Sequence, residues 1–190
     1  MALHAVGRPT IRLNGRVVVV GAGIIGLLLV QALRAAGCGH IIALDVVPNR
    51  LDLVCQLGAN VGLRADAPDV LNQVLERQDG GADLVFEAVG TPPAFQVAVE
   101  CVRKGGGLTL VGNVSPTVVL PLQRVVTREL TLYGSCQSFG EYPACPDMMA
   151  RGAIDVDPLI SAVAPLADGA AWFEKLHQRT MGLVKVILIP

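Results

Sequence analysis

The chain has 190 residues, of which 52% are hydrophobic and 16% are charged, and its formal net charge is -1 at pH 7. The Lys and Arg residues are scattered along the sequence, which disfavours nucleic-acid binding because that usually requires a basic face. The apolar stretch from Val17 to Leu33 includes glycines and Gln31 and is shorter than the roughly twenty residues of a membrane span. We therefore expect a buried strand and helix there, no membrane contact and, without a charged-then-apolar leader, a cytoplasmic protein.

Cysteine and histidine spacings indicate no metal motif. The five cysteines are odd in number and form no CxxC pair, and the three histidines lie far apart without an HExxH pattern. We expect neither a disulfide framework nor a metal site, and we assign no catalytic or metal-binding residue to this chain.

Hydrophobic periodicity predicts alternating strands and helices. Strands are expected at 16–20, 41–44, 61–63, 83–86, 108–111 and 130–134. Helices are expected at 24–36, 48–58, 69–78 and 91–102, with Thr91 as the cap of the last one. The glycines at 105–107 predict a turn before the fifth strand. This alternation predicts an α/β fold, a doubly wound parallel sheet of the Rossmann type with helices on both faces.

The first strand runs directly into the sequence Gly21-Ala22-Gly23-Ile24-Ile25-Gly26, a dinucleotide-binding fingerprint. In this pattern Gly21 permits the tight turn, Gly23 lets the backbone approach a pyrophosphate, and Gly26 allows close packing of helix on sheet. The helix N-terminus then receives the phosphate charge. An ordinary glycine turn, or an FAD or S-adenosylmethionine fold, is the alternative, and the surrounding strand and helix pattern favours the fingerprint.

Asp45 ends the second apolar run, nineteen positions beyond Gly26. Its carboxylate can accept hydrogen bonds from both hydroxyls of an adenosine ribose, whereas a 2′-phosphate would meet like charge, so NAD is favoured over NADP. Arg50 can stack on adenine from the same loop, or it is a solvated side chain. Glu87, after the fourth strand, is either a carboxylate at a helix N-terminus or a cofactor contact.

Beyond Gly140 the alternation stops. Helices are predicted at 141–151 and 168–178, and a β-forming segment at 183–189 needs a partner strand or cover. We divide the chain into a connecting helix and linker at 1–15, an NAD-binding Rossmann domain at 16–137, and C-terminal helices and a strand at 138–190.

Several segments together resemble the coenzyme-binding C-terminal half of the zinc-type medium-chain dehydrogenases, the family of alcohol, sorbitol, threonine and polyol dehydrogenases. Ala2–Val6 resembles their connecting helix, Asp83–Gly90 their fourth-strand motif, and Gly105–Gly112 their fifth strand and the following turn. The amino-acid sequence of the Gly21–Gly26 loop resembles that of polyol dehydrogenases more than that of the zinc-free quinone reductases.

The resemblance implies a role for ten residues. It places the pyrophosphate on Gly21, Gly23, Ile24, Ile25 and Gly26, the adenosine ribose on Asp45, the adenine beside Arg50, and the nicotinamide side on Val89, Val111 and Gly112. It also implies hydride transfer between a secondary alcohol or sugar alcohol and NAD, with a catalytic zinc held by a separate N-terminal domain whose ligands have no counterpart here. We expect a fragment or truncated product, with 155–190 folding onto that domain, which binds NAD but does not turn over alcohols.

Two other functions share parts of this pattern. A non-catalytic NAD-sensing module carries the same fingerprint, and the sequence upstream of Met1 discriminates it from a dehydrogenase. A short-chain dehydrogenase requires a YxxxK pair, which Tyr133 and Tyr142 do not form. The segment Thr117–Leu120 is suited to pair across a homodimer axis, as in the resembling enzymes, or it is a surface loop.

Overall fold

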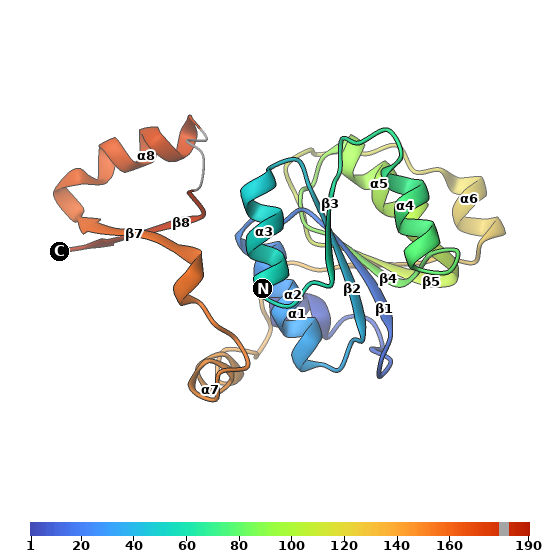
Figure 1. The fold of residues 1–190 in the computed structure, drawn as a ribbon, viewed down its shortest axis with the longest axis horizontal. Helices are drawn as coiled ribbons and strands as arrows, with labels where there is room; N and C mark the ends of the chain where they lie inside the picture. Colours follow the sequence, from blue (N-terminus) through green and yellow to red (C-terminus); the bar gives the residue numbers. More distant parts are fainter. Residues whose placement is uncertain (179–182) are drawn as a thin grey trace. The chain divides into compact units, whose positions relative to one another are not determined.

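The computed structural model describes residues 1–178 and 183–190, and the chain divides into two compact units, Met1–Ile154 and Asp155–Pro190. The larger unit contains a parallel six-stranded sheet in the order β3-β2-β1-β4-β5-β6 (Figure 1). Its strands are β1 Arg16–Val20, β2 His40–Asp45, β3 Val61–Arg64, β4 Ala82–Glu87, β5 Val102–Leu110 and β6 Thr131–Gly134. Its helices are α1 Ala2–Val6, α2 Ile24–Ala35, α3 Pro48–Gln56, α4 Val70–Arg77, α5 Pro92–Cys101, α6 Leu122–Thr127 and α7 Ala144–Ala150. The predicted doubly wound α/β fold is confirmed.

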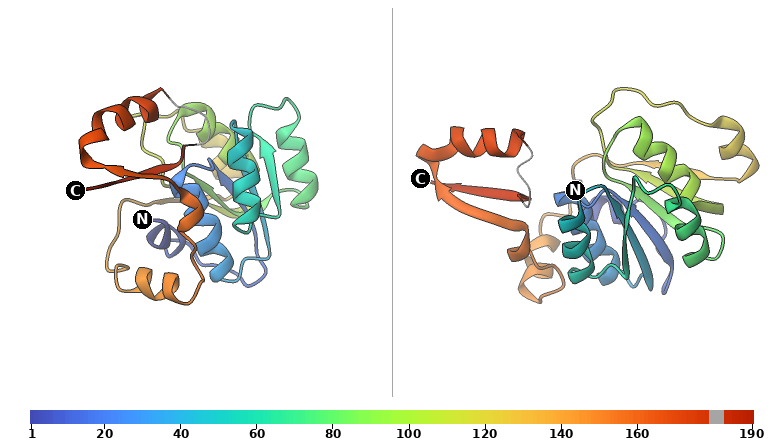
Figure 2. Two further views of the ribbon diagram at one scale, coloured as in Figure 1. Left: turned by 60° about the vertical axis from the view of Figure 1, so that its left-hand side comes forward. Right: turned by 45° about the horizontal axis from the view of Figure 1, so that its top comes forward.

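Helices cover both faces of the sheet, as two views of the ribbon show (Figures 1 and 2). α2 and α3 lie on one face, where Gly26 meets the side chain of Val19 and Gly62 meets Leu51. α4 and α5 lie on the other, where Val18 and Val20 join a buried apolar cluster with residues of both helices. Alternate side chains of a strand point to opposite faces, so a strand segment buried on both faces is apolar, as β1 is from Val17 to Val20.

One local expectation is wrong. The glycines at 105–107 lie inside β5 rather than in a turn before it, because Ala82 pairs with Val102 while Leu84 pairs with Gly107. The extra residues shift the register at the start of the strand, a feature of strand pairing that three consecutive glycines do not distinguish from a turn. The predicted position of Thr91 at the N-cap of α5 is confirmed, although its side chain makes no capping hydrogen bond.

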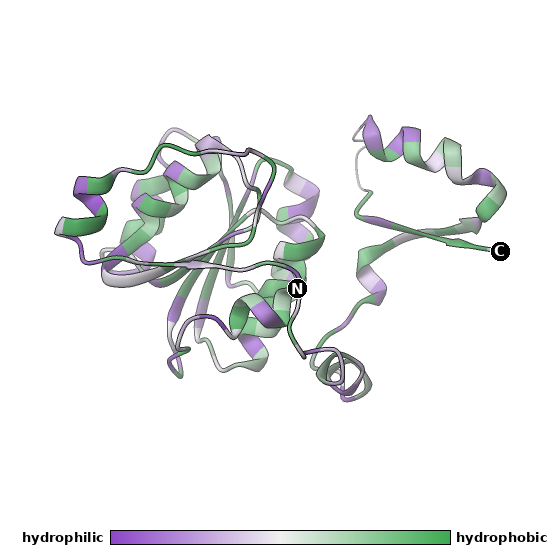
Figure 3. Cartoon of the chain, turned by 180° about the vertical axis from the view of Figure 1, so that it is seen from behind, coloured by the Kyte–Doolittle hydropathy of each residue, from purple (hydrophilic) through white to green (hydrophobic). Residues whose placement is uncertain are grey.

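The smaller unit consists of a two-stranded parallel sheet and a helix. β7 Ile160–Pro165 pairs with β8 Lys185–Ile189, and α8 Gly169–His177 connects them, flanked by the short 3₁₀ helices η1 Asp157–Leu159 and η2 Leu166–Asp168. The C-terminal strand is therefore paired within its own unit, and Figure 3 shows it largely in the colour of hydrophobic residues. Across 1–178 and 183–190, no helix combines the length and apolar character of a membrane span.

Candidate functional site

The glycine loop between β1 and α2 is built by three glycines with different constraints. Gly21 has φ +98°, a left-handed conformation that favours glycine, and a Cβ on Gly26 would lie 1.8 Å from the carbonyl oxygen of Gly21. The first turn of α2 therefore packs directly on the turn that leaves the strand. Gly23 is the N-cap of α2, and a Cβ there would meet nothing within 4 Å. The backbone at Gly23 thus faces open space at the N-terminus of α2.

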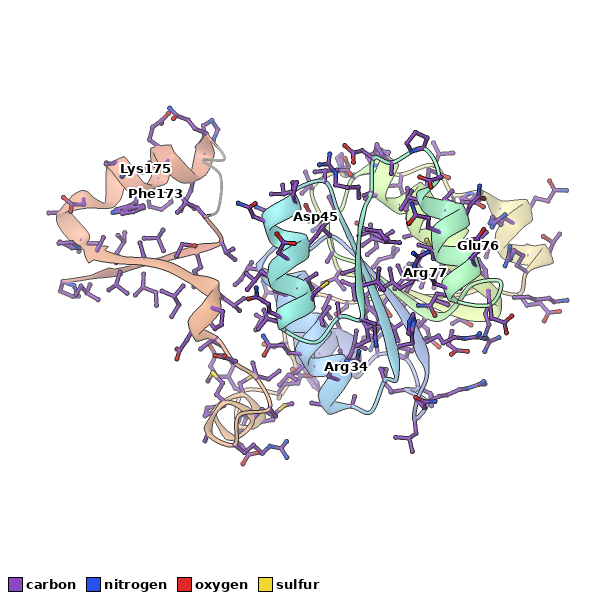
Figure 4. The ribbon with its side chains drawn as sticks, viewed as in Figure 1. Arg34, Asp45, Glu76, Arg77, Phe173 and Lys175 are labelled. Carbon is purple, nitrogen blue, oxygen red and sulfur yellow. The ribbon has the colours of Figure 1, made fainter. Side chains whose placement is uncertain are left out.

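Asp45 is held against this loop by hydrogen bonds to both of its carboxylate oxygens. Oδ2 accepts from the backbone N–H of Ala22 at 2.7 Å, and Oδ1 accepts from that of Val47 at 2.9 Å. The side chain is only 7% exposed, and Figure 4 shows it beside the end of α3 that follows β2. Since a carboxylate oxygen has two lone-pair directions, each oxygen can still accept a second hydrogen bond from a ligand hydroxyl.

The ends of β4 and β5 come together next to the glycine loop. A Cβ on Gly112 would lie 2.0 Å from the backbone nitrogen of Gly90, and a Cβ on Gly21 would lie 2.6 Å from Val89 Cγ2. Val111 and Gly112 both donate their N–H groups to the carbonyl oxygen of Glu87, at 2.8 and 2.9 Å. The structure therefore brings Val89, Val111 and Gly112 together beside Gly21, at the carboxyl edge of the sheet.

The Glu87 carboxylate is turned back onto its own loop. Its Oε1 accepts from the backbone N–H groups of Val89 at 2.8 Å and Gly90 at 2.9 Å, and the residue is 2% exposed. Burial raises the pKa of Glu87 above its ordinary value, while the hydrogen bonds from Gly90 and Val89 oppose that rise. The side chain thus fixes the turn that precedes α5.

Two arginines lie on the elements that adjoin Asp45, one on α3 and one on β3. Arg50 lies in the first turn of α3 and is half-buried. Arg64, which the sequence interpretation missed, ends β3 as the register partner of Asp45 and forms a two-point ion pair with Asp66. Its position after an apolar strand is visible in the sequence, but the order of β3 and β2 in the sheet is needed to place it beside Asp45.

A cavity lies at the opposite edge of the sheet. It measures about 340 Å³ and is lined by Asp83, Arg103, Gly106 and Tyr133, among others. Ligands of open parallel sheets bind beyond the carboxyl ends of the strands, so we do not assign the site to this cavity. Across the described part of the chain, no group of three or more His, Cys, Asp or Glu side chains could hold a metal ion.

The strand order and the glycine turn define a Rossmann-type α/β domain, with its candidate site at the carboxyl ends of β1, β2, β4 and β5. The family model described as zinc-binding dehydrogenase matches residues 25–151, and the chain belongs to that family.

Curated relatives and solved structures that resemble the chain are also dehydrogenases. Sorbitol dehydrogenase of Bombyx mori is 34% identical over 87% of this chain and 49% of its own length, and sorbitol dehydrogenase of Bacillus subtilis is 29% identical over 100% and 54%. The structure of 2R,3R-butanediol dehydrogenase from B. subtilis matches with a TM-score of 0.91 and 28% identity, covering 100% of this chain and 55% of that one. An NADP-bound candidate zinc-binding dehydrogenase from Sinorhizobium meliloti also gives 0.91, with 27% identity over 100% and 56%. The chain spans about half the length of the curated relatives it matches.

Proposed function

We propose that this chain is the NAD-binding part of a zinc-dependent alcohol or polyol dehydrogenase, which transfers hydride between a secondary alcohol or sugar alcohol and NAD. The observation that carries the proposal is the hydrogen bond between Asp45 and the backbone of Ala22, because it fixes a carboxylate next to the open backbone at Gly23. A pyrophosphate at the N-terminus of α2 and a ribose on Asp45 are then held by adjoining groups.

The residues present fit the cofactor. Gly21, Gly23 and Gly26 shape the pyrophosphate turn, and the backbone N–H groups of Ile24 and Ile25, in the first turn of α2, face the same end of the helix.

The remaining cofactor contacts follow from the same edge of the sheet. Asp45 accepts the ribose hydroxyls, Arg50 lies beside the adenine, and Val89, Val111 and Gly112 line the nicotinamide side. When bound, NAD supplies the hydride acceptor, and the protein supplies its placement.

We assign a separate role to each of three parts of the chain. Residues 1–15 form a connecting helix and linker, residues 16–137 bind NAD, and residues 138–190 belong in part to a zinc-binding catalytic domain. Both sorbitol dehydrogenases named above are about twice the matched length, which supports a catalytic half outside this chain. This chain by itself is therefore expected to bind NAD without oxidising alcohols.

Calorimetric titration of the purified chain with NAD, ADP-ribose and nicotinamide mononucleotide tests the proposal. ADP-ribose should bind nearly as well as NAD, because the pyrophosphate and adenosine ribose make the contacts with the glycine loop and Asp45. Nicotinamide mononucleotide lacks the adenosine ribose and should bind much more weakly. Absence of affinity for both NAD and ADP-ribose would reject the function.

We also propose a homodimer that forms through Thr117–Leu120 and a cytoplasmic location. Val119 in this segment is 77% exposed, and an exposed apolar stretch favours association. Val119→Asp should convert a concentration-dependent dimer to a monomer in sedimentation equilibrium without changing the melting temperature. A wild-type chain that stays monomeric at high concentration would contradict the dimer.

The proposed cytoplasmic location is supported by the cysteines. All five are free, as is usual in a reducing compartment.

A further inference from the structure

Arg64 stands beside the ribose-binding acid because of how β2 and β3 pair. Asp45 and Arg64 are register partners at the carboxyl ends of the two parallel strands, and the N–H of Ala65 donates to the carbonyl oxygen of Asp45 at 3.0 Å. Register partners in a sheet project their side chains to the same face. The side chains of Arg64 and Asp45 therefore leave the sheet on the same face, the one on which α2 and α3 lie.

Asp66 holds this guanidinium at two points. Arg64 Nε donates to Asp66 Oδ1 at 2.8 Å, and a terminal nitrogen donates to Oδ2 at 2.6 Å. Two parallel N–H···O bonds are the geometry in which a guanidinium also binds a phosphate. Asp66 thus occupies one two-donor edge of the guanidinium, formed by Nε and a terminal nitrogen, which a phosphate on the neighbouring ribose could otherwise use.

The charges around the ribose position are coupled. Hydrogen bonding to Asp66 raises the pKa of Arg64, and the negative charge of Asp45 raises it further. Both members of the pair are about half exposed, at 45% and 51%, so the pair can open without unfolding the domain.

We propose that Arg64 and Asp66 form a second determinant of the choice between NAD and NADP. While Asp66 pairs with Arg64, the ribose position presents the carboxylate of Asp45 and the Nε side of the Arg64 guanidinium is engaged, so NAD is preferred. Release of Arg64 supplies a two-point donor for a 2′-phosphate, the role that an arginine near this position serves in NADP-binding Rossmann folds. The inference rests on the proposed function, because it concerns the same cofactor site.

The test compares the Kd values of NAD and NADP for the purified wild-type chain, Asp66→Asn and Asp69→Asn. Asp69→Asn is the matched control, since it removes the same charge from the same loop, and the Asp69 carboxylate accepts from Gln73 rather than from Arg64. We expect Asp66→Asn to strengthen NADP binding relative to NAD by roughly three- to tenfold, as one released charge-assisted contact would, and Asp69→Asn to leave the ratio unchanged.

A second variant separates the role of Arg64 from a general change in charge. Arg64→Gln should have little effect on NADP affinity in the wild-type background but should abolish the gain in the Asp66→Asn background. If NAD binds normally and both asparagine variants give the same ratio of Kd values, or if Arg64→Gln does not remove the gain, the inference is wrong. If the wild-type chain binds neither cofactor, the proposed function fails instead.

Discussion

The carboxylate of Asp45 accepts a hydrogen bond from the backbone N–H of Ala22 across 2.7 Å, although 23 positions separate the two residues. This bond connects the end of β2 to the turn that follows β1. It aligns the carboxylate in advance of any ligand, so less conformational freedom is lost when a ribose binds. Asp45 therefore has both a structural role in the loop and a proposed role in cofactor recognition.

Asp45→Ala should weaken NAD binding by roughly 1 to 3 kcal/mol, the value of a lost hydrogen-bonded pair with a charged group, and narrow the preference over NADP. Asp52→Ala, which removes an exposed carboxylate one turn along α3, is the control and should leave both affinities unchanged. Calorimetric titration with both cofactors measures the effect. Unchanged NAD binding in Asp45→Ala would reject its role in ribose recognition.

Gly23→Ala and Gly26→Ala should separate binding from folding. A Cβ at Gly23 meets nothing within 4 Å, so the variant should keep its stability while losing about tenfold or more in NAD affinity, because the methyl group occupies the pyrophosphate position. A Cβ at Gly26 would lie 1.8 Å from the Gly21 oxygen, so that variant should lose roughly 1 to 3 kcal/mol or more of unfolding free energy. Urea denaturation and NAD titration of both variants provide the comparison. Full NAD affinity in Gly23→Ala would place the pyrophosphate elsewhere.

Glu87 should make the protein less stable as the pH rises. Because burial raises its pKa in the folded state, the folded chain holds this proton more tightly than the unfolded chain does. The resulting stabilisation is complete below the ordinary glutamate pKa of 4.5 and is lost as the pH rises through the higher folded-state value. Glu87→Gln should lack this component of the pH dependence in urea denaturation between about pH 4 and 8.

Glu76→Gln, on the exposed face of α4, is the matched control for Glu87 (Figure 4). It should follow the wild-type pH profile. Identical profiles for Glu87→Gln and wild type would show that the buried carboxyl does not contribute to the pH dependence.

Asp83 should act in the opposite direction. Burial opposes ionisation of its carboxyl, but the hydrogen bond from the Arg16 N–H and the ion pair with Arg103 outweigh it, so its pKa lies below the ordinary 3.8. The stabilisation is present above that ordinary value and is lost as the pH falls through the lower folded-state value. Asp83→Asn should therefore be less stable than wild type at neutral pH, and the difference should shrink in acid. A difference that stays constant from pH 7 to pH 2 in chemical denaturation would contradict this assignment.

Much of this protein is determined by local sequence. The apolar runs that form β1 and β2 predict strands buried on both faces, because a buried parallel strand excludes charge on either side. The glycine requirement at Gly21 and Gly26 follows from backbone sterics within a few residues, so the turn and the start of α2 are predictable without a structure. The position of Asp45 at a strand end is equally local.

Only the tertiary structure decides which of these residues meet. The register shift that includes Gly105 in β5 depends on pairing with β4, and three glycines by themselves fit a turn equally well. The turn of Glu87 onto Val89 and Gly90, and the approach of Gly112 to Gly90, depend on how two strand ends are aligned. Arg64 lies opposite Asp45 because β3 pairs with β2, an arrangement set by sheet order and register between separate strands, whereas sequence periodicity specifies only the face that each residue of one strand presents.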